Sequence, residues 1–280
     1  MRALARALEG ARLDYELIAV DDGSTDGTGE VLRRLAAQIN ARRSTLDDGK
    51  QPLEDQAPRH KPQGADAHDS QRSDSELKTA TAEPRSSRLG PSRLRVATNS
   101  GEHGFGMAVR CGIEHATGDA IVIFMADLSD APDDVVLYAR KLEEGAECVF
   151  GSRFIAGGKV VDYPWHKWIL NRLANGFIKV LFGLRLNDTT NAFKAYRREV
   201  IAGIGPLLSK HFNLTVEMPL KAIVRGYSHA IVPISWTNRK TGVSKLKIRE
   251  MGSRYLFIVL YVWLEKMLSR GDYRRPSPPP

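Results

Sequence analysis

Two short apolar runs in this sequence each lead into a cluster of aspartates, and this arrangement constrains the fold more than any other feature. The run ELIAV leads into Asp21 and Asp22, and the run AIVIF leads to Asp127 and Asp130. Runs of this length that are rich in β-branched residues are typical of buried strands. In a parallel sheet, both clusters would project from the same carboxyl edge, where α/β proteins bind their ligands.

Predicted strands and helices alternate along most of the chain. We expect strands at 16–20, 94–98, 120–125, 148–154 and 227–236, and helices at 2–9, 30–39, 105–116, 132–144 and 215–225. A helical pair is expected across 163–183. This alternation predicts an α/β fold with a mostly parallel sheet that carries helices on both faces.

The order of these elements suggests that the first strand of the sheet is lacking. The sequence begins on the helix at 2–9, which in an open α/β sheet commonly follows a central strand. Without that strand, the strands at 16–20 and 121–125 would have no ladder partner between them, leaving backbone groups unpaired. We therefore expect either that the natural reading frame starts upstream or that this product is compromised.

Residues 41–92 differ from the rest of the chain in composition. Their large apolar residues are a few scattered leucines, and Pro, Asp, Ser, Arg and Gln dominate. Such a segment cannot bury enough surface to offset its ordering entropy, and we predict a disordered insertion, with a phosphorylation or partner-binding role as the alternative. The predicted domain is thus divided into 1–40 and 93–245, followed by a C-terminal helix at 246–270 and a frayed tail at 271–280.

The net charge of +8 favours anionic partners such as nucleotide phosphates, phospholipid headgroups or nucleic acid. The two cysteines lie in segments with helix and strand patterns, which favours a reduced, cytoplasmic setting. The longest apolar run, YLFIVLYVWL at 255–264, is too short to span a bilayer and is flanked by basic residues. We expect an amphipathic helix that is either buried in the core or lies in the membrane interface, which would make the protein peripheral on the inner face of the membrane.

The aspartates offer hard oxygen ligands, which suit Mg²⁺ or Mn²⁺ bridging a diphosphate. The basic loop NRKTGVSK supplies Arg239, Lys240 and Lys245, which could close over the same phosphates. Taken separately, each feature also has a plain structural interpretation, as a helix cap and as a solvated surface loop.

The order of five motifs resembles that of the family 2 glycosyltransferases of GT-A fold. These motifs are VDDGSTDGT, then GFGMAVRCGIEHATGDAIVIFMADLSD, FGSRF, NDTTNAFKAYRREV and NRKTGVSKLK. The resemblance covers about residues 3–40 and 93–270. It looks closest to the branch, typified by dolichyl-phosphate mannosyltransferase, that moves a sugar from a nucleotide to a polyprenyl phosphate.

The resemblance implies a role for each matching residue. Asp21 and Asp22 would lie near the nucleotide, and Asp127 would hold the metal and diphosphate together with Asp130. Residues that contact the phosphates complete the implied site: Arg153, Arg239, Lys240, Ser244 and Lys245. Asp188 would face the reacting centre. The structural alternatives are that Asp22 caps a turn, that Arg153 pairs with a core carboxylate and that Asp188 starts a helix.

The implied reaction is a displacement at the anomeric carbon, with inversion, in which a UDP- or GDP-linked sugar is transferred to a polyprenyl phosphate. A phosphate monoester has a second pKa of about 6, so it is largely ionised at neutral pH and requires no strong general base. Nucleic acid is not an expected partner, because the tryptophans lie in apolar contexts. The competing interpretation is a catalytically impaired scaffold or membrane-surface protein that keeps the fold.

One departure from the family pattern bears on the metal. Met125 stands where the family usually has the first Asp of Asp-x-Asp, and Ser129 stands where a further polar ligand is common. A thioether is a poor ligand for Mg²⁺, so we expect Asp127 and Asp130 to hold the ion with the donor phosphates, or the basic loop to neutralise more of the charge. Glu217, an isolated acid in an apolar helix, has no role that the sequence reveals.

Overall fold

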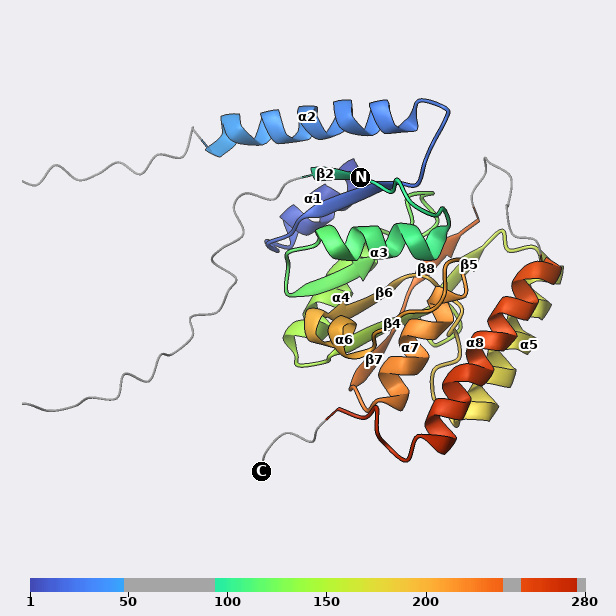
Figure 1. Ribbon diagram of the computed structural model, residues 1–280. Coiled ribbons are helices and arrows are strands. Elements are labelled where there is room, and N and C mark those ends of the chain that lie inside the picture. The colour runs from blue at the N-terminus through green and yellow to red at the C-terminus, as the bar shows by residue number, and fades with distance from the viewer. Residues whose placement is uncertain (48–93, 239–247, 276–280) are drawn as a thin grey trace, which may run out of the picture.

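The computed structural model describes residues 1–47, 94–238 and 248–275 (Figure 1). Its strands are β1 (Leu17–Asp21), β2 (Leu94–Thr98), β3 (Ala120–Ile123), β4 (Cys148–Ser152), β5 (Lys159–Val161), β6 (Lys194–Arg197), β7 (His229–Pro233) and β8 (Ser235–Thr237). Its helices are α1 (Arg2–Gly10), α2 (Thr28–Asp47), α3 (Phe105–His115), α4 (Asp133–Glu143), α5 (Trp165–Phe182), α6 (Arg198–Gly203), α7 (Leu214–Val224) and α8 (Ile248–Leu268). The residues predicted to bind phosphate, Arg239, Lys240, Ser244 and Lys245, lie outside the described residues.

The centre of the fold is a four-stranded sheet in the order β3-β6-β4-β7. β4 is buried along its whole length, and its side chains alternate between the two faces. Val149 packs with Tyr138 of α4 on one face, while Phe150 packs with Leu214 of α7 on the other. Helices therefore cover both faces of the sheet, as the sequence predicted.

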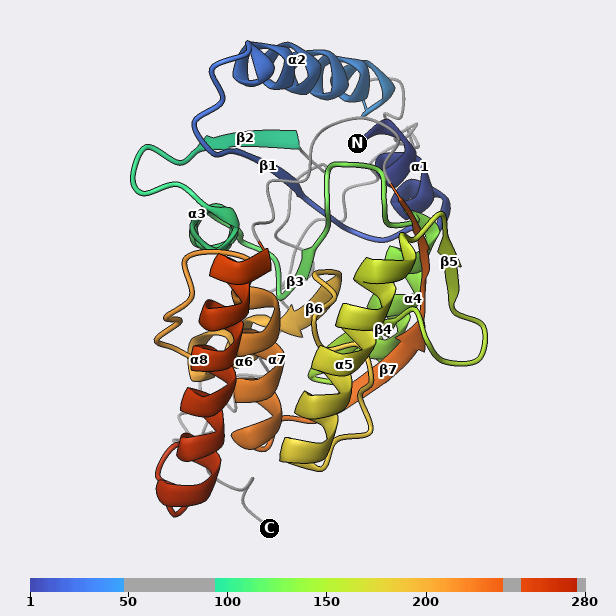
Figure 2. The same cartoon turned by 90° about the vertical axis from the view of Figure 1, so that its right-hand side faces the viewer.

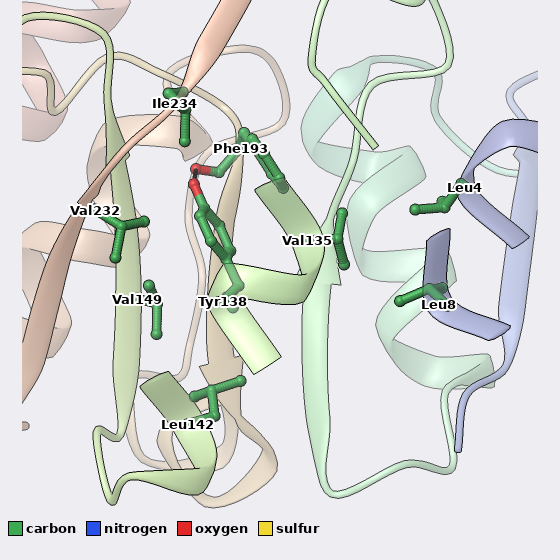
Figure 3. Close-up of a cluster of buried hydrophobic side chains, with 10 residues drawn as sticks. Leu4, Leu8, Val135, Tyr138, Leu142, Val149, Phe193, Val232 and Ile234 are labelled. Carbon is green, nitrogen blue, oxygen red and sulfur yellow. Dashed lines mark hydrogen bonds between the residues drawn. The ribbon is translucent and has the colours of Figure 1, made fainter. Parts of the chain in front are cut away.

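α1 extends the layer that α4 forms on one face. Leu4 and Leu8 are one helical turn apart, and they join Val135 and Tyr138 in one apolar cluster (Figure 3). The hydroxyl of Tyr138 donates a hydrogen bond to the carbonyl of Phe193 (2.8 Å). A Cβ at Gly151 would lie 2.1 Å from that hydroxyl, so the close approach of α4 to β4 requires glycine there.

α7 lies between the sheet and a further layer of helices. Its Leu214, Met218 and Ala222 belong to the cluster on the sheet, whereas Val216 and Leu220 belong to the cluster formed with α5 and α8. A helix enclosed in this way is apolar on all sides, which explains the composition of NLTVEMPLKA. It also means that Glu217 is fully buried.

The predicted strand pairing is correct in part. β1 pairs with β2 in a parallel two-stranded sheet, and β3 belongs to the central sheet, so β1 and β3 are not paired with each other in the described residues. Each of them has another partner, β2 for β1 and β6 for β3, so neither strand lacks a ladder partner, which corrects the expectation from the sequence. β6, which the sequence pattern did not reveal, runs antiparallel to both β3 and β4.

Three predicted elements have different boundaries. The helical pair expected at 163–183 is the single helix α5, which ends where Gly183 takes the left-handed conformation (φ 67°). The strand expected at 227–236 is broken: β7 pairs with β4, and after Ile234 the chain turns to pair with β5 as β8. α2 continues to Asp47 and so passes the predicted start of the insertion at residue 41; residues 48–92 of that segment lie outside the described residues.

The two-stranded β1–β2 sheet should be less stable than the four-stranded central sheet, because isolated pairs of strands depend on the helices around them. We expect amide hydrogens of β1 to exchange at least about tenfold faster than those of β4 under native conditions. Hydrogen–deuterium exchange with peptide or residue resolution measures this directly. Equal protection of β1 and β4 would contradict it.

Candidate active site

The acidic loop after β3 is shaped by its own side chains. Asp127 accepts hydrogen bonds from the backbone N–H of Ser129 (3.1 Å) and from its hydroxyl (2.6 Å). Leu128, between them, is in the left-handed region (φ 63°) and is exposed. Ser129, which stands where the family has a further polar ligand, is buried and bound to Asp127.

The same loop is fixed to β8. The N–H of Thr237 donates to the carbonyl of Ser129 (2.9 Å), and Asp130 forms an isolated antiparallel bridge with Trp236. The carboxylate of Asp134 accepts the N–H of Ser235 (2.7 Å), which fixes the first turn of α4 to the same strand. β8 therefore joins the acidic loop to the segment from which the predicted basic loop continues.

Asp130 is the buried acid of this loop. It is 4% exposed, and among the described residues its Oδ1 has no hydrogen-bond partner. Burial, and next the charge of Asp127, raises the pKa of Asp130 to about 7, against the opposing effect of Arg153. The loop thus holds a carboxyl group that lacks a cation or donor at one oxygen.

Arg153 and Asp188 form a buried bidentate ion pair. Nε and Nη2 of Arg153 each lie 2.8 Å from an oxygen of Asp188, and the backbone N–H of Arg153 also donates to it (3.0 Å). The guanidinium lies over the rings of Phe154, Tyr163 and Trp236, at 5.3–5.6 Å from their centroids. The structural alternative considered for Arg153, pairing with a core carboxylate, is what the structure shows.

This pair changes the interpretation of Asp188. Asp188 has no exposed surface, and both of its oxygens accept hydrogen bonds from Arg153. We therefore interpret Asp188 as a residue that orients Arg153, in place of the expected position facing the reacting centre.

Lys194 is a residue of this region that the sequence analysis missed. Its ammonium donates to the carbonyl of Thr189 (3.0 Å) and to that of Asn191, and it is almost fully buried on β6. Burial lowers its pKa to about 7, opposed by the charge of Asp188. The sequence feature that could have pointed to Lys194 is a single lysine between apolar residues in NAFKAY.

The two aspartates that were predicted to lie near the nucleotide, Asp21 and Asp22, form a second group. Asp22 accepts hydrogen bonds from the backbone N–H of Gly104 (2.8 Å) and from the side chain of Asn99 (2.6 Å), so it ties the end of β1 to the turn before α3. Asp21 is buried and accepts hydrogen bonds from Ser24, which lower its pKa. The hydrogen bonds and ion pairs thus bring the predicted residues into two sets, one around β8 and one at the end of β1.

Comparison with known proteins identifies the family. The model of the family described as glycosyl transferase family 2 matches residues 1–51 and 72–205, more than half of the chain. The chain belongs to glycosyltransferase family 2. This confirms the resemblance drawn from the five motifs.

Two curated relatives are enzymes that act with polyprenyl lipids. Polyprenol monophosphomannose synthase of Mycolicibacterium smegmatis is 33% identical over 161 residues, which cover 56% of this chain and 61% of the relative. Dolichol-phosphate mannosyltransferase of Pyrococcus furiosus is 29% identical over 157 residues, which cover 55% of this chain and 44% of the relative. The match therefore spans only about half of the length of these proteins.

Solved structures confirm the fold. Glucosyl-3-phosphoglycerate synthase from Mycobacterium tuberculosis, in complex with Mn²⁺, UDP and glucosyl-3-phosphoglycerate, superposes with a TM-score of 0.53 at 14% identity, covering 94% of this chain and 74% of that chain. A further mycobacterial protein gives a TM-score of 0.50 at 16% identity, covering 91% of this chain and 64% of that one. The predicted α/β fold of GT-A type is thus confirmed.

The acidic loop can be tested for its fit to a divalent cation. Among the described residues, no group of three His, Cys, Asp or Glu side chains could hold a metal by itself. Asp127 and Asp130 supply two carboxylates, and the Oδ1 of Asp130 is a buried oxygen without a donor. Mg²⁺ is commonly held by one or two carboxylates together with substrate phosphates and water. The residues therefore fit an ion whose coordination is completed by a bound diphosphate.

Asp130 should make the stability of the metal-free protein depend on pH. Its folded-state pKa of about 7 lies above the ordinary value of 3.8, so ionising the group costs folding free energy as pH rises from about 4 through 7. We expect the change in unfolding free energy caused by Asp130→Asn to be more stabilising at pH 8 than at pH 5. The difference between the two changes should be on the order of 1–3 kcal/mol. Chemical denaturation at both pH values, with chelator present, measures the difference.

Because the charge of Asp127 itself contributes to the raised pKa of Asp130, the control for this measurement is Asp133→Asn, which removes an exposed carboxylate from the first turn of α4. Its effect should differ less between the two pH values. An Asp130→Asn effect that is the same at pH 5 and pH 8 would show that Asp130 is not the strained acid.

Proposed function

We propose that this chain is the catalytic domain of an inverting glycosyltransferase that moves a sugar from a nucleotide-sugar donor to a polyprenyl phosphate. The observation that supports this most is the arrangement around β8, in which a family 2 chain places an acidic loop beside a buried, charged arginine. The two curated relatives, which are named for polyprenol-linked and dolichol-linked mannosyl transfer, support the acceptor class.

In this proposal, Asp127 and Asp130 hold Mg²⁺ or Mn²⁺, and the similar structure of glucosyl-3-phosphoglycerate synthase is a complex with Mn²⁺ and UDP. When bound, such an ion offsets the charge that builds on the departing diphosphate. Arg153, which Asp188 keeps charged and oriented, adds a fixed positive charge next to the acidic loop. Asp21 and Asp22 border the nucleotide, and the basic residues at 239–245 complete the phosphate contacts.

The acceptor needs little activation by the protein. Its phosphate is already largely ionised at neutral pH, since its second pKa is about 6. The oxygen that attacks the anomeric carbon therefore carries its charge before it enters the site. What this chain must do is hold donor and acceptor in line and neutralise the phosphates.

Nucleotide binding tests the donor half of the proposal. We expect one nucleoside diphosphate, UDP or GDP, to raise the melting temperature with Mn²⁺ and to have little effect with chelator, because a ligand that binds only the native state stabilises it. Asp127→Asn should remove at least about 90% of the shift at a fixed ligand concentration, through loss of a metal ligand. Differential scanning fluorimetry with both nucleotides measures this.

A matched control is Asp133→Asn, which removes an acid from the first turn of α4 near the same loop. It should leave the nucleotide shift intact. A shift that survives both Asp127→Asn and chelator would exclude the metal site, and no shift with any nucleotide would favour the scaffold alternative.

The acceptor half of the proposal is supported by a face made of α5 and α8. The two helices lie on the same side of the molecule, at the right in Figure 1, and Figure 2 shows α7 between them. Large apolar side chains are exposed on both: Trp165, Trp168, Ile169, Leu170, Leu173, Phe177 and Val180 on α5, and Leu256, Phe257, Leu260, Tyr261, Leu264, Met267 and Leu268 on α8. We call this set the α5–α8 face.

This face has the properties of a surface that binds a bilayer. Trp165 is 74% exposed and Val180 is 84% exposed, at opposite ends of α5, so the apolar surface runs along the whole helix. α5 carries Lys167, Arg172 and Lys179 and no acidic residue, the pattern of helices that lie in an anionic membrane interface. In the described residues, no helix is long and apolar enough to cross a bilayer. We propose that the α5–α8 face rests on the membrane that carries the polyprenyl acceptor.

Vesicle binding tests the face. Val180→Glu places a charge where the apolar surface meets lipid, and we expect it to reduce partitioning onto anionic phosphatidylglycerol vesicles by about tenfold. Val31→Glu is the matched control, since it makes the same change at an exposed valine on α2, away from this face. Sedimentation with vesicles measures both variants. Equal losses, or none with Val180→Glu, would exclude the face as the docking surface.

A further inference from the structure

Glu217, the isolated acid of α7, is a fully buried hydrogen-bond acceptor with three donors. Its carboxylate accepts the backbone N–H groups of Leu208 and Ser209, each at 2.7 Å, and the ammonium of Lys221 at 2.7 Å. Lys221 in turn donates to the carbonyl of Pro206. The two side chains, one turn apart on α7, therefore hold the chain between residues 206 and 209 from one side.

α3 holds the same segment from the other side. The guanidinium of Arg110 donates to the carbonyls of Leu207 (2.6 Å) and Ser209 (3.0 Å). The rings of Phe105 and Phe212 stack with centroids 4.6 Å apart. We call residues 206–212 the bridging segment, because it fills the space between α7 and the first turns of α3.

The bridging segment also caps α3. The backbone N–H groups of Gly106 and Met107 both donate to the carbonyl of Lys210 (3.0 and 3.3 Å), which satisfies two donors that the first turn of a helix leaves unpaired. The contact is close enough to exclude side chains, since a Cβ at Gly106 would lie 2.5 Å from the carbonyl oxygen of Ser209. The position of the first turn of α3 therefore depends on where the bridging segment lies.

That first turn is joined to the nucleotide side of the site. Gly104, immediately before α3, donates its N–H to Asp22 (2.8 Å), and a Cβ at Gly104 would lie 2.6 Å from the carbonyl oxygen of Lys210. Lys210 also pairs with Glu102 (2.7 Å) in the same turn. A displacement of the bridging segment would thus move the groups that surround the Asp22 carboxylate.

We infer that Glu217 is a positioning residue for the nucleotide side of the site, acting through the bridging segment on the turn at 102–104 and on Asp22. This inference rests on the proposed function, in which Asp22 borders the nucleotide. Glu217 does not touch the ligand. It fixes the backbone that presents Asp22, so its loss weakens nucleotide binding by altering the shape of that part of the site.

Glu217→Gln is the direct test, because the amide keeps the size of the side chain but replaces one acceptor oxygen with a donor that faces an N–H group or Lys221. The control is Glu265→Gln, which breaks the buried pair of Glu265 on α8 with Arg225 at the end of α7. Both variants lose a buried carboxylate, so both should lower the melting temperature. Only Glu217 contacts the bridging segment.

We expect Glu217→Gln to raise the dissociation constant of the nucleoside diphosphate, measured by calorimetry with Mn²⁺, by about tenfold. Glu265→Gln should leave the constant within about twofold of the wild-type value. Arg110→Met, which releases the bridging segment from the α3 side, is the second variant should Glu217→Gln not fold, and it should weaken binding in the same direction. Equal constants in wild type and Glu217→Gln, or equal losses in both glutamate variants, would overturn the inference.

Hydrogen exchange tests this inference by a measurement that does not depend on the proposed function. Glu217→Gln should speed exchange at the amides of Gly106 and Met107 relative to those of α8, whereas Glu265→Gln should not. If the wild-type chain binds no nucleoside diphosphate, the proposed function fails, and exchange still decides whether Glu217 controls the first turn of α3. Unchanged exchange at Gly106 and Met107 would refute that control whatever the nucleotide result.

Discussion

The ion pair between Arg153 and Asp188 is the interaction on which the rest of the candidate site depends. A charge buried as deeply as Asp188 is tolerated only with a partner and further hydrogen bonds, because desolvation of an isolated ion costs several kcal/mol. Arg153 meets this requirement with two side-chain bonds and one backbone bond. The geometry fixes the chain after β4 and leaves the guanidinium near Asp130. Its positive charge lowers the pKa of Asp130 and so opposes the effect of burial. A structural requirement of the core thus places a permanent positive charge beside the acidic loop.

β8 connects this charge to the loop because the strand changes partner at Ile234. Ile234 donates its N–H to the carbonyl of Ser152 at the end of β4 (3.1 Å), and its own carbonyl accepts the N–H of Lys159 (3.0 Å). The chain therefore leaves the central sheet at the position where Arg153 begins, and it carries Trp236 over the guanidinium. Had the strand continued along β4 through residue 236, the acidic loop would not have β8 as its backbone partner.

The sequence predicted the local features well because they depend on neighbouring residues. The run LRVAT forms β2 with the predicted boundaries, and α1, α3, α4 and α7 lie close to theirs. The acids of the two apolar runs lie at the end of β1 or in the loop after β3. The features that were missed depend on packing between distant segments. β6 is a short strand whose place between β3 and β4 is set by pairing, and the burial of Lys194 follows from that place. The sequence also did not reveal that one face of α5 is exposed. An apolar helix face has the same composition whether or not another element packs against it.

Met125 has a consequence for how metal and nucleotide binding are related. An aspartate there would bring a third carboxylate to a loop in which burial and Asp127 already raise the pKa of Asp130 to about 7. With methionine, the metal-free loop holds less negative charge and is less strained, but it also offers the cation fewer ligands. In the proposed site, the ion therefore depends on the diphosphate for the remainder of its coordination, and the diphosphate depends on the ion for charge neutralisation. Each ligand then raises the affinity of the other by the same factor, so this departure from the family pattern favours strongly coupled binding of metal and donor.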